Sequence, residues 1–346
     1  MQIVISVIAL LLVVAIAVYF YLFYPQQRMP IGEPVEVRTV QREKYHDDCL
    51  HPCIRYDAKT GKYYMAQSPY YAWNNKGENP MFYMSDDYKT WMEGTLIADT
   101  PDKGYNSDPN ILLTDSGKVC FIWRECKSLQ CEQNGGNRMI VGGMLVNGKL
   151  LNKQIYAVNS WEHGDYIQCP TLVERDGKYY IFAVWYQYEP VRKNLGIAIW
   201  RGTSLDVSDF ELLQTIPIKS IYTVDRIAQL RLFGRIWYIP KPLHHDIWHF
   251  DLFEYDGKLW MVSVAERGDN IMLSVAEDWK HFKTYRKPLV NNHYTENDCG
   301  YRQYYYKPTA FVNDDTLHVY YTANAMDDPN RNQLYHSSLP AKQVLR

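Results

Sequence analysis

The chain opens with one long apolar stretch and continues with short apolar runs separated by turn signals. Residues 3–24, "IVISVIALLLVVAIAVYFYLFY", contain no charged side chain. A helix of this length can cross the hydrocarbon core of a bilayer, and its final Tyr/Phe cluster suits the membrane interface. No basic segment precedes the stretch and no small-residue cleavage site follows it, which favours an uncleaved anchor over a signal peptide. We therefore expect a membrane anchor in residues 1–27 and a folded domain in residues 28–346.

One phrase recurs five times in the folded domain. It begins at residue 50 as "LHPCIRYDAKTGKYYMAQSP" and returns as "SDPNILLTDSGKVCFIWRE", "QCPTLVERDGKYYIFAVW", "WHFDLFEYDGKLWMVSVA" and "YKPTAFVNDDTLHVYYTA". Each phrase contains an apolar run, a turn of the TGK, SGK, DGK or NDD type, and a second apolar run. This order indicates a β-hairpin. The hairpins recur at intervals of about 60 residues, which is typical of a repeat architecture.

Radial repetition of small antiparallel sheets produces a β-propeller, so the sequence predicts an all-β domain with five blades. A WD-type propeller is disfavoured because its repeat is shorter and its Gly-His and Trp-Asp signatures are missing. The segment "EPVEVRTV", residues 33–40, is expected to add an outer strand to the last blade and close the ring. The expected inner strands are 50–55, 107–113, 168–173, 248–254 and 306–312.

The interval between the third and fourth phrases is the longest. Its extra residues lie in "KSIYTVDRIAQLRLFGRIWYIPKPLHH", residues 219–245. Long loops over a propeller face often shape a binding pocket, although a purely structural elaboration is an equal alternative.

The first word of each phrase varies, while the rest is repeated. Side chains alternate along a strand, so the first residue of the phrase and the residue two positions later share a face. On an innermost strand that face is directed at the propeller axis. Five polar and mutually different pairs should therefore converge there and form a site. These pairs are His51/Cys53, Asp108/Asn110, Cys169/Thr171, His249/Asp251 and Lys307/Thr309.

The charge and the aromatic content of the chain bear on which kind of ligand it binds. The net charge of −2 gives no electrostatic reason to expect a nucleic acid. The chain has 30 Tyr and 10 Trp residues, which favour strands and also stack on flat ligands such as sugar rings. Strand packing accounts for most of them.

The spacing of the cysteines does not specify disulfide bonds, and the spacing of the histidines does not specify a metal site. Seven cysteines, an odd number, do not suggest a full disulfide framework, although Cys49/Cys53 and Cys126/Cys131 are close enough in sequence to pair. No cofactor and no metal is predicted. A zinc site built from His244, His245 and His249 is disfavoured because their spacing matches no known zinc motif.

The phrases "HPCIRYD", "YNSDPNILL", "CPTLVERDGKYYIF", "WHFDLFEYDGKLWMV" and "YKPTAF", together with "ENPMFYMSDDYKTW", carry a family resemblance. The chain resembles the five-bladed propeller glycoside hydrolases of the arabinanase/xylosidase and invertase/levansucrase families. It is more similar still to a bacterial and phage group of glycosidase-like propellers. The resemblance implies a carbohydrate substrate and three carboxylates on the inner strands of blades one to three. Asp108 keeps the blade-two carboxylate, whereas His51 and Gln168 stand where the other two are expected.

Glycoside hydrolysis normally needs two carboxyl groups on opposite sides of the scissile bond. Asp108 and Asp251 are the expected catalytic pair, with the pKa of one raised by burial and mutual repulsion so that it acts as the acid. Glu78, before a later strand of blade one, is the third candidate. The expected substrate-binding residues are His51, Gln168, His249, Trp248, Lys307, Arg302 and Arg124. Trp73 is a weaker stacking candidate, because packing is the commoner role of a single tryptophan.

The sequence therefore predicts a membrane-anchored glycoside hydrolase acting on an oligosaccharide or polysaccharide. A carbohydrate-binding pseudo-enzyme and an interaction propeller are the alternatives. Arg28, Arg38, Arg42 and Lys44 follow the apolar stretch, and this charge bias favours a cytoplasmic domain. Polymeric glycans usually lie outside the cell, and on that ground we expect an extracytoplasmic domain.

Overall fold

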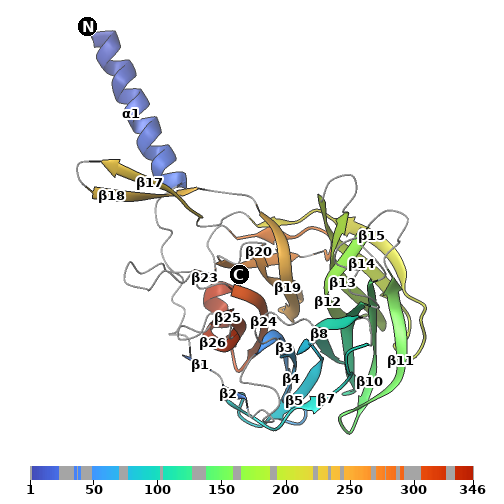
Figure 1. The fold of residues 1–346 in the computed structure, drawn as a ribbon. Helices are drawn as coiled ribbons and strands as arrows, with labels where there is room; N and C mark the ends of the chain where they lie inside the picture. Colours follow the sequence, from blue (N-terminus) through green and yellow to red (C-terminus); the bar gives the residue numbers. More distant parts are fainter. Residues whose placement is uncertain are drawn as a thin grey trace.

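The chain forms a ring of five antiparallel sheets, each presenting one strand to a central axis (Figure 1). This is a computed structural model. It describes residues 2–22, 35–36, 38–39, 49–69, 77–101, 104–126, 138–158, 165–187, 193–220, 225–232, 235–241, 245–265, 270–276, 278–285, 289–291, 305–324 and 332–345.

The blades follow one another along the sequence, and each runs outward from its inner strand. Blade one contains β3 (Leu50–Asp57), β4 (Lys62–Ser68), β5 (Met81–Ser85) and β7 (Thr95–Leu96). Blade two contains β8 (Tyr105–Leu113), β9 (Val119–Cys126), β10 (Arg138–Val146) and β11 (Lys149–Val158). Blade three contains β12 (Asp165–Arg175), β13 (Lys178–Gln187), β14 (Lys193–Gly202) and β15 (Glu211–Ile216).

Blade four is larger, and blade five borrows a strand. Blade four contains β19 (His245–Tyr255), β20 (Lys258–Ala265), β21 (Asn270–Ala276) and the short strands β16 (Lys219–Ser220), β22 (Lys283–Thr284) and β23 (Val290–Asn291). Blade five contains β24 (Tyr305–Asn313), β25 (Thr316–Asn324), β26 (Asn332–Pro340) and β1 (Val35–Glu36). Each of the five predicted inner strands is confirmed, as is the five-bladed propeller.

The ring is closed by its two ends. β1 pairs antiparallel with β26, and Val35 lies opposite His336, as expected for the segment 33–40. The short strand β2 (Arg38–Thr39) pairs in parallel with β6 (Thr90–Trp91) beside blade one. The N-terminal part of the domain therefore ties the last blade to the first.

The hairpin turns explain why turn-forming residues recur in the centre of each repeated phrase. In blade three, Asp176 and Gly177 form a two-residue turn and both have positive φ, 51° and 67°. Both central residues of a type I′ turn need this conformation, and its twist matches that of the strands it joins. Blade five makes the same turn without glycine, since Asp314 and Asp315 have φ of 47° and 56°.

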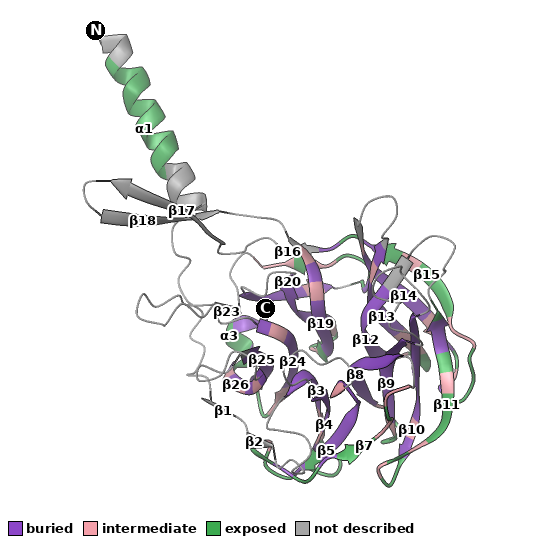
Figure 2. Ribbon diagram, viewed as in Figure 1, coloured by how far each residue is buried: buried purple, intermediate pink, exposed green. Residues whose placement is uncertain are grey.

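The apolar core lies between the blades. Side chains from neighbouring sheets interdigitate in five large clusters, and most residues of the inner and second strands are buried (Figure 2). A short terminal helix, α3 (Ala341–Val344), adds Val344 to the cluster between blades four and five. The inner strands are thus held rigidly around the axis, which is what a site built on them requires.

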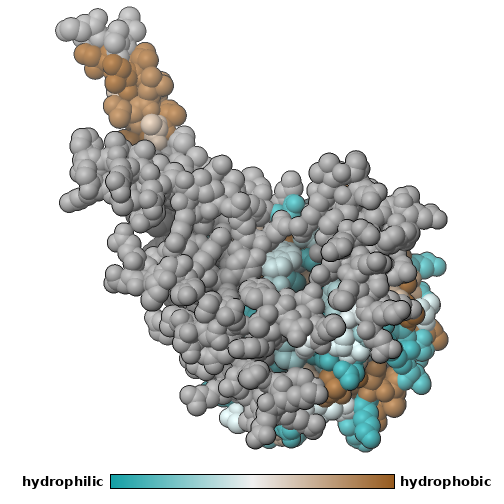
Figure 3. Space-filling view, in the orientation of Figure 1, coloured by the Kyte–Doolittle hydropathy of each residue, from teal (hydrophilic) through white to brown (hydrophobic). Residues whose placement is uncertain are grey.

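Two elements stand outside the ring in Figure 1. The first is α1 (Gln2–Leu22), whose described side chains, residues 5–16, are exposed and mostly apolar (Figure 3). No helix in the described part of the chain has the length and apolar character that a bilayer span requires, and the predicted anchor is not confirmed. The second is a hairpin of β17 (Asp225–Leu232) and β18 (Arg235–Lys241), formed by the long segment before blade four.

Candidate active site

All five inner strands carry a register irregularity near the start of the repeated phrase. The register shifts occur between Leu50/Cys53, Ser107/Asn110, Gln168/Thr171, Ile247/His249 and Tyr305/Pro308. In blades one to three the shift includes the variable first residues of the phrase, in blade five it includes Lys307, and in blade four it falls at Trp248, one residue before His249. A β-bulge bends its strand and redirects side chains, and bulges are frequent beside active sites.

Three of the bulges hold a non-glycine residue in the left-handed region. The φ angles are 55° at His51, 52° at Asp108 and 52° at Cys169. Each such residue costs about 1–2 kcal/mol, because its Cβ approaches the backbone too closely. Each also precedes a proline, which restricts it further. The sequence retains this strain at three equivalent positions, all of them facing the axis.

Below the bulges lies a set of side chains that we call the second layer: Cys53, Asn110, Asp251 and Thr309, with Arg55. Arg55 donates from Nη1 to Oδ2 of Asp251 at 2.7 Å and from Nη2 to Oδ1 at 2.8 Å. Thr309 donates to Oδ2 at 2.5 Å, and Asn110 donates to Oδ1 at 3.2 Å and to the Cys53 sulfur at 3.1 Å. Four blades are joined by these contacts, so the predicted convergence of the inner strands is confirmed.

Asp251 is fully buried, and the contacts of the second layer occupy both of its oxygens. Burial works to raise its pKa, but the Arg55 charge and hydrogen bonds outweigh burial and hold that pKa below the usual value. Asp251 is therefore a counter-ion that ties blade four to blade one.

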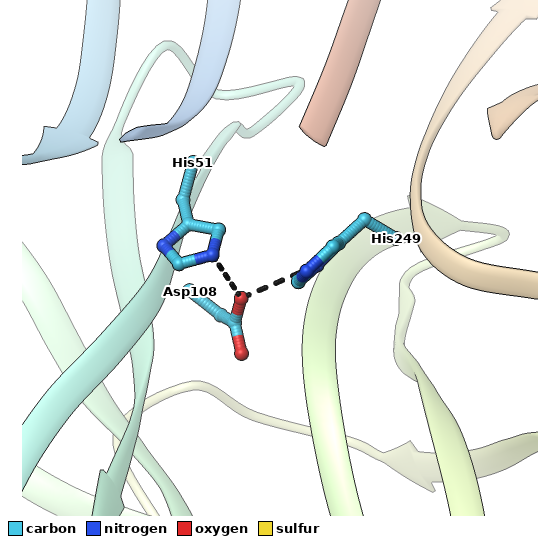
Figure 4. A group of neighbouring side chains, drawn as sticks. All are labelled: His51, Asp108 and His249. Atoms are coloured by element: carbon cyan, nitrogen blue, oxygen red, sulfur yellow. Dashed lines mark ion pairs between the residues drawn. The ribbon is translucent and has the colours of Figure 1, made fainter. Parts of the chain in front are cut away.

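A second set, which we call the bulge layer, consists of His51, Asp108, His249 and Glu78. Figure 4 shows two imidazole rings approaching the Asp108 carboxylate from opposite sides. Oδ1 of Asp108 lies 3.1 Å from Nε2 of His51 and 3.5 Å from Nδ1 of His249. Oδ2 lies 3.0 Å from Nε of Arg124 and accepts a hydrogen bond from the Cys169 backbone N–H at 3.1 Å.

Electrostatics in the bulge layer follow from burial. Burial lowers the pKa of His51 to about 3 and that of His249 well below its usual value, so both rings are neutral at pH 7. Burial is the largest single influence on Asp108 and works to raise its pKa, but the Arg124 guanidinium together with His51, His249 and Lys307 outweighs burial and holds the Asp108 pKa well below normal. The expectation that Asp108 or Asp251 has a raised pKa is therefore wrong, because each carboxylate has its own arginine.

Glu78 reaches His51 from the other side of the imidazole. Its Oε1 lies 2.9 Å from Nδ1 of His51 and accepts a hydrogen bond of 2.5 Å from the Ser107 hydroxyl. The Ser68 hydroxyl lies 3.2 Å from the same ring nitrogen. Glu78 is buried, and it fixes the orientation of His51.

Aromatic rings border the bulge layer. The Trp248 ring lies 4.4 Å from His249 and 4.6 Å from Tyr306, and the Tyr306 ring lies 4.9 Å from His249 and 5.2 Å from His51. Trp248 and Tyr306 are partly exposed, unlike the polar groups beneath them. Sequence reasoning missed Tyr306. Strict alternation places it on the opposite face from Lys307, whereas the bulge lets the residue before the first word face the site as well.

The remaining predicted residues are distributed around this site. Gln168 donates to the Trp248 carbonyl at 3.0 Å and orders the tryptophan backbone. Lys307 is fully buried and donates to the Pro109 carbonyl at 2.9 Å. Arg124, besides holding Asp108, lies over the Tyr105 ring at 5.6 Å. Arg302 and Trp73 lie outside the described residues.

The structure also places the candidate cysteine pairs and the two predicted catalytic aspartates. Cys49 and Cys53 do not pair with each other, and Cys131 lies outside the described residues, so the Cys126/Cys131 combination is not described. The predicted catalytic aspartates occupy different layers: Asp108 lies among histidines, and Asp251 lies among groups that neutralise it.

No protein-family model matches the chain, and no curated protein matches its sequence. Solved structures do match its shape. An N-acetylgalactosamine deacetylase from F. plautii, solved with blood group B trisaccharide, has a TM-score of 0.63 and 12% identity over 88% of this chain and 92% of its own. An α-L-arabinofuranosidase from Lactobacillus brevis has a TM-score of 0.54 and 14% identity over 86% and 94%. A thermostable family-43 glycoside hydrolase has a TM-score of 0.56 and 15% identity over 84% and 88%. The chain thus has the five-bladed propeller fold of these glycoside hydrolases and of the deacetylase.

Proposed function

We propose that this chain is a glycan-active hydrolase with its reaction centre in the bulge layer. One observation carries the proposal. Asp108 and His51, both on strained backbone, meet His249 at the axis, directly beside two partly exposed aromatic rings. Buried polar groups with shifted pKa values beside accessible aromatic side chains are typical of an active site. Aromatic faces suit sugar rings, and the similar solved structures include enzymes that act on glycans.

Cleavage of a glycosidic bond is the first candidate reaction. It is supported by the glycoside hydrolases among the similar structures and by Asp108, which occupies the inner strand of blade two. Glu78 is the second carboxylate of the same layer, and it replaces Asp251 as the partner of Asp108 in this proposal.

Removal of an acyl group from a sugar is the second candidate, and a specific observation favours it. The His51 ring stands between Glu78 and Asp108, in contact with both carboxylates. A scissile glycosidic bond would need that space, because the two carboxyl groups of a glycosidase flank their substrate. Hydrolysis of an amide or ester needs instead an activated water and a group that stabilises the oxyanion.

A product assay distinguishes the two reactions. The purified full chain is incubated with a panel of plant, bacterial and animal glycans, half of them N- or O-acetylated, and both reducing ends and released acetate are measured. Reducing ends support glycosidic cleavage, and acetate supports deacylation. An Asp108→Asn variant must lose either activity. Glycan binding without either product overturns the hydrolase and supports the carbohydrate-binding alternative.

A further inference from the structure

We infer that His51, Asp108 and His249 form a binding site for one divalent transition-metal ion of the zinc class. The three residues come from β3, β8 and β19, three different blades, and all are buried. One ligand atom from each lies within 4.8 Å of the other two. In Figure 4 both rings are directed at the same carboxylate oxygen. This set is distinct from the His244, His245 and His249 combination that the sequence spacing disfavoured.

Three polar atoms of the cluster make no hydrogen bond in the described part of the chain. Oδ1 of Asp108 and both ring nitrogens of His249 are buried and make no hydrogen bond with any described residue. Leaving a buried polar atom without a hydrogen bond costs about 1–3 kcal/mol. Two such atoms, Oδ1 of Asp108 and Nδ1 of His249, lie 3.5 Å apart. A single cation shared by the three side chains would engage Oδ1 of Asp108 and one ring nitrogen of each histidine.

The proton on His51 points to the same conclusion. Glu78 approaches Nδ1 at 2.9 Å, and a carboxylate can only accept, so the ring proton lies on Nδ1. Nε2 then carries a lone pair, yet it lies 3.1 Å from the Asp108 oxygen, which also carries lone pairs. Two lone pairs at that distance repel unless a cation lies between or beside them.

The surrounding groups match those that support metal ligands. A metal-bound histidine usually donates its other ring N–H to a carboxylate, which fixes the ring and increases its basicity. Glu78 has that position relative to His51, and Ser107 in turn holds Glu78. Arg124 and the Cys169 N–H bind only Oδ2 of Asp108, which leaves Oδ1 for the ion.

The donor types identify the class of ion. Two imidazoles and one carboxylate suit zinc and neighbouring transition metals, whereas calcium and magnesium prefer oxygen ligands throughout. Three protein ligands leave a coordination position for water, as in catalytic zinc sites. The binding inference stands on the ligand geometry alone. Its catalytic consequence, that the ion activates the attacking water, rests on the proposed function.

Direct binding measurements test the inference. The full chain is stripped with a chelator and dialysed, then titrated calorimetrically with Zn²⁺, and bound metal is counted by mass spectrometry. We expect one equivalent with sub-micromolar affinity. His249→Ala should weaken binding at least about 100-fold, and Glu78→Gln about 10–100-fold, as for other groups that support metal ligands. Cobalt(II) should give the visible spectrum of a four-coordinate ion, which His249→Ala abolishes.

An exposed histidine outside the site provides the control. His281→Ala removes an exposed histidine that pairs with Asp278 and should bind zinc like the wild type. Thermal melts establish that each variant is folded. Less than one tenth of an equivalent, or binding unchanged in His249→Ala, overturns the site. Metal binding without glycan hydrolysis refutes the proposed function alone, and hydrolysis by metal-free protein refutes only the catalytic role of the ion.

Discussion

The two layers at the propeller axis are built from the same strands and differ in how their polar groups are satisfied. In the second layer, both oxygens of Asp251 are engaged by Arg55, with Asn110 and Thr309 adding one hydrogen bond each. In the bulge layer, Asp108 Oδ1 and the His249 ring nitrogens lack such partners among the described residues. A fully satisfied buried network fixes structure, whereas buried polar atoms without hydrogen bonds that lie close together are typical of a ligand-binding site.

The backbone shows the same difference. The bulge layer contains His51 and Asp108 in the left-handed region, while Cys53, Asn110 and Asp251 do not have positive φ. Strain at the bulges is stored by the rigid core around them, and the second layer supplies part of that rigidity. We therefore expect substitutions in the bulge layer to affect chemistry and those in the second layer to affect stability.

The largest expected effect is the loss of activity in Asp108→Asn. Removing the charge that the two histidines share should lower kcat/KM about 10³–10⁴-fold, which corresponds to roughly 4–5.5 kcal/mol. Initial rates on the substrate found in the product assay measure it. Asp86→Asn, an exposed aspartate that pairs with Lys62, is the matched control and should be fully active. Near-normal turnover in Asp108→Asn would remove the bulge layer from the mechanism.

Asp251→Asn should act on stability instead. Removing one partner of a buried ion pair leaves the other charge uncompensated, so the free energy of unfolding should fall by about 3–5 kcal/mol. Urea denaturation followed by fluorescence measures it. The double variant Arg55→Met/Asp251→Leu should recover part of the loss, because both charges are gone. A stable but inactive Asp251→Asn would show that Asp251 takes part in the chemistry after all.

Trp248→Ala tests the aromatic border of the bulge layer. Losing one stacking face should weaken substrate binding about 5–10-fold, roughly 1–1.4 kcal/mol, and raise KM more than it lowers kcat. Steady-state kinetics separate the two constants. Trp279→Phe, which alters a tryptophan packed under Arg175 between blades three and four, should leave KM unchanged. An unchanged KM in Trp248→Ala would place the substrate elsewhere.

The smallest effect concerns a histidine pair remote from either layer. His318 Nδ1 lies 3.0 Å from His336 Nε2 in blade five, and burial lowers the pKa of each to about 4. In the unfolded chain the two imidazoles have pKa values near 6.5, so on acidification the unfolded state takes up protons before the folded state does. The contribution of the neutral pair to the free energy of unfolding is therefore complete above pH 6.5 and is lost as the pH falls towards 4. Melting temperatures between pH 7 and pH 4.5 should fall less in His336→Phe than in the wild type. An equal fall of melting temperature with pH in the two proteins would show that the histidine pair does not contribute to the pH dependence of stability.

Much of the fold could be predicted from the sequence because it depends on local, repeated signals. Turn residues such as Asp176-Gly177 and the alternating apolar runs specify each hairpin, and five copies of a hairpin specify the ring. The pairing of 33–40 with the last blade followed from the ring's need to close. Convergence of His51, Asp108 and His249 at the axis followed from strand alternation alone, and the structure confirms it.

The chemistry of the site was decided by the tertiary structure. The sequence predicted Asp108 and Asp251 as one catalytic pair, but it contains no signal that Arg55 of blade one would form an ion pair with Asp251 of blade four. The bulges that bring Tyr306 to the site and the contact of Glu78 with His51 are also long-range effects. A pKa or an unpaired lone pair depends on all the groups within a few ångströms, and these come from different blades. The repeated phrase therefore determined where the strands lie, and only their closure into a ring decided which carboxylate would be neutralised by an arginine and which would face two histidines.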